Sequence, residues 1–412
     1  MSAILAVNAG SSSLKFALFE NAAPFELIAR GEVAGLPARP TFHARGVSGT
    51  LANQACAGVS TTLDALEQVL AWIALQFPHV EISAVGNRVV HGGTRFVGPV
   101  ILHELVLSEL ERLDPLAPQH QPFNLAVARV LRERFPQALP IACFDTAFHA
   151  NWPDAARRLP LPRHWHEEGV RRYGFHGLSY EFLSERVHTL IPRARRVVLA
   201  HLGSGASICA VLDGCSIDST MGFSALDGLP MATRSGAIDP GVIFHLHRRG
   251  MDFEAIETML YRDSGLKGVS GATGDMRELL SSSAGEAREA IDLFVHRCTA
   301  AIGAMIATLG GIDALAFSGG IGANSPEIRA AICTRLACFG VRIAPAANRA
   351  NDERIARPSS RVRVFALATD EEYVIARHSR ALLAAHGRLG TPELAAACAE
   401  VDRNQYASAS PA

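Results

Sequence analysis

Three clusters of glycine and serine each follow a short apolar run, and this pattern can bind phosphate groups. They occupy residues 8–13 after the run at 3–7, residues 203–207 after 197–202, and residues 318–325 after 314–317. Backbone N–H groups of small residues approach a polyphosphate closely, and serine hydroxyls add donors without bulk. Lys15 adds a positive charge beside the first cluster. One such cluster alone is more often an ordinary turn, but three together predict a polyphosphate site.

The spacing of these clusters disfavours two common nucleotide sites and favours a third arrangement. The chain has no G-x-x-x-x-G-K-[ST] segment, and the glycines at 319–322 do not match G-x-G-x-x-G. Second apolar runs at 14–19 and 208–212 predict two β-hairpins, which align after one inserted residue and indicate two divergent halves. Pro326 favours a helix to residue 336 with Ser325 as N-cap, after a loop at 318–325. These features predict a nucleotide held between two lobes.

Composition limits the possible partners. The 412 residues are 49% hydrophobic and 19% charged, which is typical of a globular chain of two or three domains. Lys plus Arg number 39 against 40 Asp plus Glu, so no net charge attracts nucleic acid or an acidic membrane. Residues 300–317 are interrupted by Gly310, Gly311 and Asp313, and they predict a helix, a turn and a buried strand instead of a transmembrane span. The N-terminus lacks a basic region before its apolar run, so we expect a cytoplasmic protein.

The C-terminal part combines a helix signal with a tail of different composition. Thr369-Asp-Glu-Glu372 matches a capping box and predicts a helix to about residue 385. Residues 386–412 are rich in Ala, Ser and Pro, so we expect a weakly packed tail whose last residues are disordered. The eight cysteines form no C-x-x-C pair, and we expect them to be reduced and mostly buried.

Segments between residues 8 and 377 match a family pattern along nearly the whole chain: NAGSSSLKF, NRVVHGG, PLAPQHQPFN, CFDTAFH, RRYGFHGLSY, HLGSGAS, DSTMGFSALDGLPMATRSGAIDPG, FSGGIGANS and ATDEEYVIAR. The chain thereby resembles the acetate kinases, within the acetate and sugar kinase/heat-shock ATPase/actin superfamily. The resemblance implies an α/β fold of two actin-like (ribonuclease H-like) lobes, each a mixed β-sheet flanked by helices, with the active cleft between them. It implies an N-terminal lobe of residues 1–147 completed by 370–412, and a nucleotide-binding lobe of residues 148–369.

The resemblance also implies an activity. It is reversible in-line phosphoryl transfer from ATP to acetate, giving ADP and acetyl phosphate, with Mg²⁺ or Mn²⁺ and in a homodimer. A kinase for propionate or another short-chain carboxylate is the alternative. A nucleotide switch of the actin or chaperone kind is a remote alternative, because a switch has no use for a second substrate site beside the γ-phosphate. A sugar kinase would need several hydroxyl-binding groups and a catalytic base.

Residue by residue, the resemblance implies a carboxylate site beside a phosphoryl site. Arg88 binds the carboxylate and Arg234 the transferring phosphoryl group, and a guanidinium suits both because its planar fork meets two oxygens. His176 matches a histidine that stabilises the transition state, and His120 matches a second active-site histidine. Asp145 matches the active-site aspartate. We expect it to orient Arg88 or a metal-bound water, because a carboxylic substrate is already ionised at pH 7 and needs no base.

Metal and nucleotide contacts also follow from the resemblance. Asn8 and Glu371 match the Mg²⁺ site, and Glu372 is a nearby competitor. Ser204, Met276 and Ala323 replace the usual Asn, Phe and Glu, which leaves the choice between ATP and other nucleoside triphosphates open, although Met276 can still cover a base. The expected nucleotide contacts are Lys15, His201, Leu202, Gly203, Ser204, Gly205, Asp275, Met276, Arg277, Gly320, Ile321, Gly322, Ala323 and Asn324.

Four positions are expected around the methyl group of the substrate: Val90, Gln119, Phe175 and Ala225. Gln119 stands where the family usually has Leu, and its amide needs a partner. Ala225 stands where Pro is usual, and it is smaller and leaves the backbone freer. One methylene changes discrimination by only about 1–3 kcal/mol. We therefore expect acetate to be preferred, with substantial activity on propionate.

Overall fold

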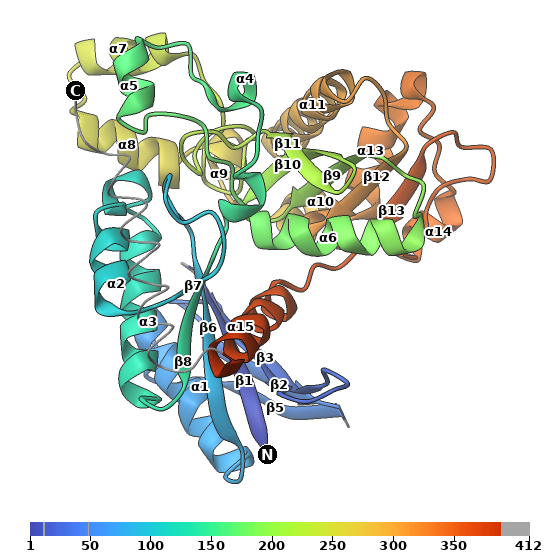
Figure 1. The fold of residues 1–412 in the computed structure, drawn as a ribbon. Coiled ribbons are helices and arrows are strands. Elements are labelled where there is room, and N and C mark those ends of the chain that lie inside the picture. Colours follow the sequence, from blue (N-terminus) through green and yellow to red (C-terminus); the bar gives the residue numbers. More distant parts are fainter. Residues whose placement is uncertain (11–12, 48, 389–412) are drawn as a thin grey trace.

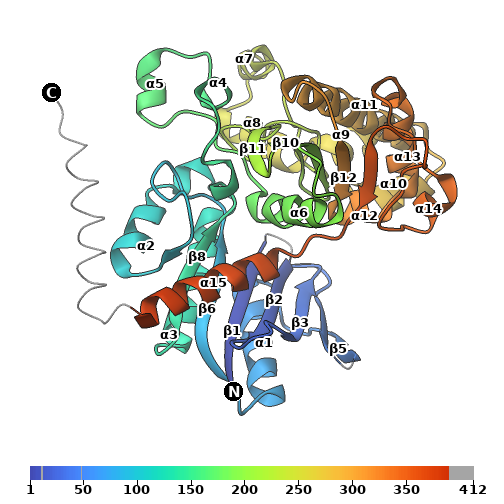
Figure 2. The ribbon, with the colours of Figure 1, turned by 45° about the vertical axis from the view of Figure 1, so that its right-hand side comes forward.

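The computed structural model describes residues 1–10, 13–47 and 49–388, which form two α/β bodies, each built around one mixed β-sheet (Figure 1). The first sheet holds the N-terminal strands, and the second holds strands from later in the chain. Helix α15 (Glu371–Arg388) returns from the second body and lies along the first sheet in both views (Figures 1 and 2). The lobe boundaries expected above, 1–147 with 370–412 and 148–369, stay a prediction.

The first sheet contains β1 (Ser2–Ala9), β2 (Ser13–Glu20), β3 (Leu27–Ala34), β4 (Thr41–Gly46), β5 (Gly49–Ala55), β6 (Glu81–Val89), β7 (Val100–Ile101) and β8 (Leu139–Phe144). Its order is β5-β4-β3-β2-β1-β6-β8-β7. Helices α1 (Thr62–Gln76) and α3 (Gln121–Arg134) pack on one face, where Phe16, Phe42 and Trp72 form an aromatic cluster; α2 (Glu104–Glu111) packs on α3. On the other face, Val374 and Ile375 of α15 pack on β1. Both faces are thus covered near β1 and β6.

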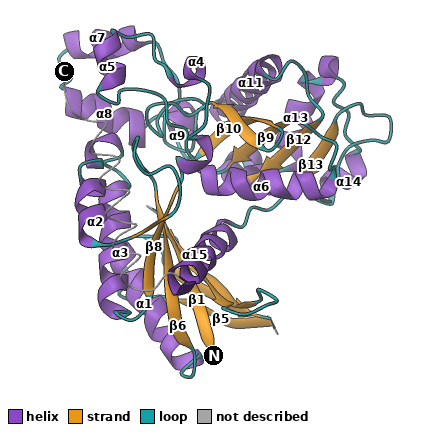
Figure 3. Ribbon diagram, in the orientation of Figure 1, coloured by secondary structure: helices purple, strands orange, loops and turns teal. Residues whose placement is uncertain are grey.

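The second sheet has the order β11-β10-β9-β12-β13 (Figure 3). Its strands are β9 (Arg196–Leu202), β10 (Ala206–Leu212), β11 (Cys215–Ser219), β12 (Ala314–Ser318) and β13 (Arg363–Ala366). Helix α6 (Gly177–Leu190) packs on one face and α11 (Gly285–Thr308) on the other. The remaining helices are α4 (Asp154–Arg157), α5 (Arg163–Glu167), α7 (Pro240–Arg248), α8 (Phe253–Arg262), α9 (Gly265–Ser270), α10 (Met276–Ser281), α12 (Gly319–Asn324), α13 (Pro326–Arg335) and α14 (Pro345–Arg349).

Five strands of each sheet repeat the same order and directions. β3-β2-β1-β6-β8 corresponds to β11-β10-β9-β12-β13, with an antiparallel hairpin followed by parallel neighbours in both. Both hairpins expected from the sequence are confirmed as β1–β2 and β9–β10. The shared order supports the two related halves that the hairpins indicate, and it brings the two hairpin tips to equivalent places in the two sheets.

Asp370, and not Thr369, caps α15. Asp370 Oδ1 accepts a hydrogen bond from Tyr373 N at 3.0 Å, whereas Thr369 Oγ1 is buried without a partner among the described residues. The expected capping box is wrong because Arg30 pairs with Asp370 at 2.6 Å and helps to hold that side chain at the helix start. The helix continues past residue 385 to residue 388, the last described residue, and the rest of the expected tail, 389–412, lies outside the described residues.

The glycine-rich segment after β12 is the short helix α12 instead of the expected loop. Glycine has low helix propensity, but Arg329 donates to the carbonyl oxygens of Gly322 and Ala323 at 2.9 and 2.8 Å. These bonds satisfy carbonyl groups that a helix end leaves free. Ser325 stands at the N-terminal boundary of α13, as expected, but its side chain makes no capping bond.

Helix α11 is the one helix among the described residues whose length and composition would suffice to cross a membrane. Its residues Phe294, Cys298 and Ile302 are buried in the core of the second body, and core helices of soluble proteins pass the same test. With β12 it confirms the helix, turn and strand expected at 300–317. The cysteines are mostly buried, as expected, except Cys215 and Cys338, and Cys398 lies outside the described residues.

Candidate active site

One pocket lies where the two hairpins and the starts of α12 and α15 meet. Its volume is about 460 Å³. The residues come from both bodies, so the pocket has the two-sided form that the paired hairpins predict. It is lined by Asn8, Gly10, Ser13, Lys15, Arg88, His120, His176, His201, Gly203, Ser204, Gly205, Arg234, Gly319, Gly320, Ala323, Asn324, Ala368, Thr369 and Glu371.

Asp145 holds Arg88 in place at this pocket. Arg88 is the penultimate residue of β6, and Asp145 follows the last residue of its parallel neighbour β8. Arg88 Nε lies 3.0 and 3.1 Å from the two Asp145 oxygens, and Nη2 lies 2.6 Å from Oδ2. Burial alone would lower the pKa of Arg88, but the Asp145 carboxylate outweighs burial and raises that pKa above its usual value. Arg88 therefore stays charged, and this geometry matches the orienting role expected of Asp145.

His176 stands immediately before α6 in a strained backbone conformation. Its φ of 59° lies in the left-handed region, which residues other than glycine rarely adopt. His176 Nδ1 lies 2.8 Å from Ser207 Oγ, and Tyr180 Oη lies 2.5 Å from the same oxygen. A Cβ on Gly205 would lie 3.2 Å from His176 Nε2, so the glycine leaves room for this nitrogen beside the hairpin tip. Burial, together with nearby positive groups, holds the pKa of His176 well below its usual value, and the ring is neutral at pH 7.

The hydroxyls of Tyr180 and Ser207 form a chain of hydrogen bonds that ends at His176 Nδ1. When Tyr180 donates to Ser207 Oγ, the Ser207 hydroxyl donates to Nδ1, and the neutral ring keeps its hydrogen on Nε2. Sequence reasoning missed both partners. Two features could have located them. Tyr180 follows His176 by four residues, which is one helical turn, and Ser207 pairs with His201 across the β9–β10 hairpin.

His201 stacks on His176, with ring centroids 4.4 Å apart and planes at 22°. His201 Nδ1 lies 2.8 Å from Ser179 Oγ, and burial lowers the pKa of His201. Two neutral imidazoles thus lie side by side, each bonded to a serine through Nδ1. Both line the pocket, so each ring can offer Nε2 to a phosphate oxygen.

Arg234 lies across the pocket with no carboxylate partner among the described residues. Its Nη1 donates to Ala225 O at 3.0 Å, and its Nη2 lies 3.4 Å from His120 Nε2. Burial lowers the pKa of Arg234, but a guanidinium remains protonated in proteins. Burial and Arg234 lower the pKa of His120 to about 3, so this ring is also neutral. A partly buried, unpaired guanidinium in this position is suited to bind an anion.

Glu371 and Glu372 share one amide group at the start of α15. Asn8 Nδ2 donates to Glu371 Oε2 at 2.8 Å and to Glu372 Oε1 at 2.9 Å. Burial raises the pKa of Glu372, and a cation would relieve the repulsion between carboxylates this close. In the described part of the chain no group of three or more His, Cys, Asp and Glu side chains could hold a metal. A cation beside Asn8 would therefore need oxygens from a bound phosphate.

The residues expected around the substrate methyl group lie behind or beside the pocket. Val90 and Phe175 are buried in the core of the second body, against which Ala225 packs. Gln119 lines a neighbouring pocket of about 310 Å³, where its Oε1 accepts a hydrogen bond from Arg262 at 2.9 Å. The amide of Gln119 thus has the partner that its position requires.

Among the expected nucleotide contacts, Gly320, Ala323 and Asn324 line the main pocket, whereas Asp275, Met276 and Arg277 do not. Asp275 caps α10 and pairs with the exposed Arg277 at 2.5 Å. Met276 is buried in the core of the second body, and its contact with a base stays a prediction. Its apolar chain packs better in that core than in water. Other expected contacts buried beneath the pocket surface are Leu202, Ile321 and Gly322.

Solved structures of similar proteins share this fold. A propionate kinase from Francisella tularensis matches with a TM-score of 0.84 and 32% identity, over 92% of this chain and 100% of that one. An acetate kinase from Porphyromonas gingivalis matches with a TM-score of 0.80 and 32% identity, over 93% and 100%. The expected fold of two actin-like α/β lobes is thereby confirmed.

Sequence relatives agree with the structural matches. Acetate kinases from Methylocella silvestris and Rhodopseudomonas palustris are 45% and 46% identical over 394 and 385 residues, or 92% and 91% of this chain and 98% and 97% of theirs. The model of the acetokinase family matches residues 3–377. Because this match includes both hairpins and every residue around the main pocket, the chain belongs to the acetokinase family.

Proposed function

We propose that this protein is an acetate kinase, which transfers the γ-phosphoryl group of ATP to acetate and gives ADP and acetyl phosphate reversibly. The observation that carries the proposal is one pocket with two differently held arginines. Arg88 is oriented by Asp145, as a carboxylate clamp requires, and Arg234, beside the hairpin tips, pairs with no carboxylate of the described residues. A nucleotide switch has no need of this second arginine site.

The chemistry follows from these side chains. An acetate oxygen attacks the γ-phosphorus in line, the bond to the β,γ-bridging oxygen breaks, and ADP leaves with the electron pair. Acetate is ionised at pH 7, so no general base takes part. Charge spreads over the equatorial oxygens, where Arg234 and N–H donors of neutral His176 and His120 stabilise it. Asp145 keeps Arg88 on the acetate carboxylate.

Asn8, Glu371 and Glu372 fit a site for Mg²⁺, with Mn²⁺ as a substitute. Their oxygens are hard ligands, and two adjacent carboxylates favour a cation. The metal would neutralise charge on the ATP phosphates. Lys15 and the glycine-rich tips at 203–205 and 319–324 would contact the phosphates. Because Ser204 and Ala323 replace the usual Asn and Glu, the preference for ATP over other nucleoside triphosphates has to be measured.

The acyl site supports acetate as the preferred substrate with substantial use of propionate. Ala225 packs against the core that contains Val90 and Phe175, and Ala leaves more space than the Pro usual there. Gln119 is bonded to Arg262. The structural relative from Francisella tularensis is titled a propionate kinase, in keeping with a small difference between the two substrate preferences.

A homodimer in the cytoplasm is the assembly we propose. Helix α7 has no buried side chain, and apolar residues on and beside α7 and α8 are exposed: Ile238, Val242, Phe244 and Phe253. The two helices pack on each other, so these residues form an apolar region that a second copy of the chain would cover. The balanced charge of the chain fits small-molecule substrates and neither nucleic acid nor membrane.

Trapping of acyl phosphates by hydroxylamine tests the proposed function. We expect product with acetate, less with propionate and least with butyrate, each measured with ATP and GTP. The matched variant Ala225→Pro should narrow the range toward acetate. A preference for acetate over propionate above about 200-fold in kcat/KM would show that the pocket is closed in another way. ATP turnover that ignores all three carboxylates would favour the switch.

A further inference from the structure

Asn124 lies in the first turn of α3 and bridges the ends of β1 and β6. Its Oδ1 accepts a hydrogen bond from Val90 N at 3.2 Å, and its Nδ2 donates to Ala9 O at 2.9 Å. The side chain is buried beside the catalytic pocket and does not line it. Because a buried amide group that loses its partner is costly, these two bonds fix the side chain in one orientation.

The bridge stands where the backbone ladder between β1 and β6 stops. The last register pair of these parallel strands is Val7 with Asn87, although both strands continue for two more residues. The carbonyl group of Ala9 ends β1, and the N–H group of Val90 directly follows β6, so both lie beyond the ladder. The amide of Asn124 gives these two backbone groups the partners that a neighbouring strand would otherwise give them.

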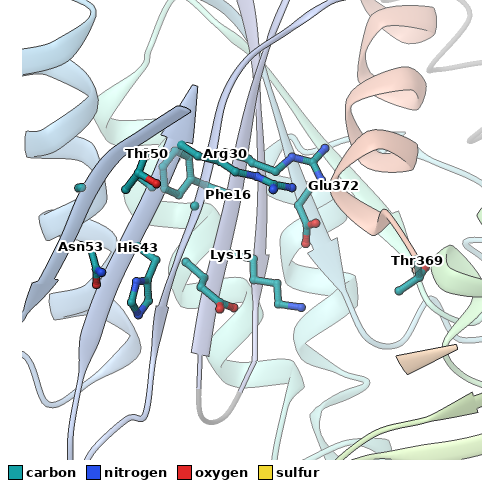
Figure 4. A pocket seen from close by; sticks show the side chains of 13 residues that line it. Lys15, Phe16, Arg30, His43, Thr50, Asn53, Thr369 and Glu372 are labelled. Carbon is teal, nitrogen blue, oxygen red and sulfur yellow. The ribbon is translucent and has the colours of Figure 1, made fainter. Parts of the chain in front are cut away.

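The end of β1 carries the phosphate and metal side of the proposed reaction. Asn8 directly precedes the residue that Asn124 binds, and its amide donates to Glu371 and Glu372 of α15. The register partner of Asn8 on β2 is Lys15, and Figure 4 shows Lys15 and Glu372 on the same face of the sheet. Asn124 reaches this strand end from α3, which covers the opposite face.

The end of β6 carries the carboxylate side of the proposed reaction. Arg88, which Asp145 orients, stands two residues before Val90. The first turn of α3 also holds the next peptide group, because Gln121 Oε1 accepts from His91 N at 3.1 Å and Gln121 Nε2 donates to His91 O at 3.0 Å. Helix α3 thereby holds two successive residues of the segment that follows Arg88.

We propose that Asn124 is a positioning residue, which sets the distance between the carboxylate site at Arg88 and the metal site at Asn8. It acts through the backbone of Ala9 and Val90. Another bond between the same ends, from Arg88 Nη1 to Asn8 Oδ1 at 3.3 Å, uses groups that the substrates and the metal would engage. Transfer requires the reacting atoms to lie about 3–3.5 Å apart, and an error of about 1 Å can lower the rate about 10²-fold. The inference rests on the proposed function.

Steady-state kinetics of Asn124→Ala, with acetate and ATP varied separately at saturating Mg²⁺, test this role. The pair of Arg88 with Asp145 is untouched, so each KM should stay within about threefold of the wild type, while kcat per folded enzyme should fall at least about tenfold. Asn124→Leu replaces most of the lost volume and should give the same result. The matched control is Asn348→Ala in the second body. Asn348 and Asn124 are both 3% exposed, and each donates to a backbone carbonyl, but the control should leave kcat within about twofold.

The outcomes distinguish this role from the proposed function. A wild-type protein that does not phosphorylate acetate would overturn the proposed function. An active wild type with unchanged kcat in both Asn124 variants would overturn only the role of Asn124. So would an equal fall of kcat in Asn348→Ala, raised KM values at unchanged kcat, or the failure of both Asn124 variants to fold, because Asn124 would then serve stability alone. Circular dichroism and urea titrations give the folded fraction of each variant.

Discussion

At the scale of the residue, the decisive feature is the difference between two arginines. Arg88 has a carboxylate partner that fixes its position, whereas Arg234 is held by Ala225 O and lies against His120. The sequence motifs singled out both arginines, because family roles are attached to these two positions. Ser207 and Tyr180 lie inside matched segments too, but their contacts with His176 arise from strand register and one turn of helix, which the motifs do not state.

Replacement of Arg234 should affect catalysis much more than folding. Arg234 pairs with no carboxylate in the part of the chain that the structure describes, so Arg234→Ala leaves no carboxylate there without its partner. We expect kcat to fall roughly 10³-fold or more, since an arginine clamp on a phosphoryl group supplies that much. Steady-state kinetics and circular dichroism on the purified variant measure both quantities. A folded variant with kcat within tenfold of the wild type would refute the role of Arg234.

Loss of the Ser207 hydroxyl should change the tautomer of His176. In Ser207→Ala, Nδ1 loses its donor, and the hydrogen is no longer confined to Nε2. We expect kcat to fall about tenfold with little change in the KM for ATP. Nitrogen chemical shifts of labelled histidine report the tautomer directly. Ser184→Ala on α6, whose hydroxyl bonds to Gly214 O, is the control. An unchanged tautomer in Ser207→Ala would contradict this account.

At the scale of the element, α15 joins the two bodies. It packs on β1 and β6, and its Arg377 pairs with Glu181 of α6 at 2.5 Å and with Glu185. The existence of this helix was predicted from the helix-start signal at Thr369-Asp-Glu-Glu372. Its cap was not, because the choice of Asp370 over Thr369 depends on Arg30, which is 340 positions away in the sequence. The helical form of 319–324 likewise depends on distant Arg329.

The identity of the cap is testable by stability. Asp370→Ala removes both the bond to Tyr373 N and the pair with Arg30, and we expect a loss of about 1–2 kcal/mol in the free energy of unfolding. Thr369→Val should change it by no more than about 0.5 kcal/mol, because the Thr369 hydroxyl has no partner to lose. Urea titrations measure both. A larger loss in Thr369→Val than in Asp370→Ala would restore Thr369 as the cap.

At the scale of the whole molecule, buried neutral histidines link stability to pH. Burial lowers the pKa of His149 to about 4; the hydrogen bond with Phe175 raises this pKa and Arg172 lowers it, both by smaller amounts. An unfolded histidine titrates near 6.5. The unfolded chain therefore binds a proton that the folded chain does not, and stability is lost as pH falls from about 6.5 toward 4. His91 and His120 act in the same direction, with pKa values lowered by burial to about 4 and about 3.

Between pH 7 and pH 5, His149 alone should contribute about 2 kcal/mol to the loss of stability. His149→Gln should reduce this pH dependence even if it lowers stability at pH 7, because the ring bonds to Ser216 and Phe175 are also lost. His188→Gln, at an exposed position, is the control. Urea titrations at the two pH values give the loss of unfolding free energy between them. An equal loss in His149→Gln and in the wild type would show that His149 is not a source of the pH dependence.

The two-sheet architecture was predictable from the paired hairpins and the family motifs together, since each hairpin begins a sheet of the same order. The burial of Met276 was not predictable. Met276 stands after Asp275 where the family usually has Phe, and its side chain packs in the core of the second body, because the burial of an apolar chain depends on neighbours that the motif does not contain.

Steady-state kinetics of Arg88→Ala, with acetate and ATP varied separately, tests the central claim that a carboxylate bound by Arg88 receives the phosphoryl group. Arg88 contacts acetate in the ground state and in transfer, so the KM for acetate should rise and kcat should fall, while the KM for ATP stays near that of the wild type. Arg88→Lys should recover only part of the activity, because an ammonium lacks the planar fork. An unchanged KM for acetate together with a raised KM for ATP would contradict the claim and place Arg88 on the nucleotide.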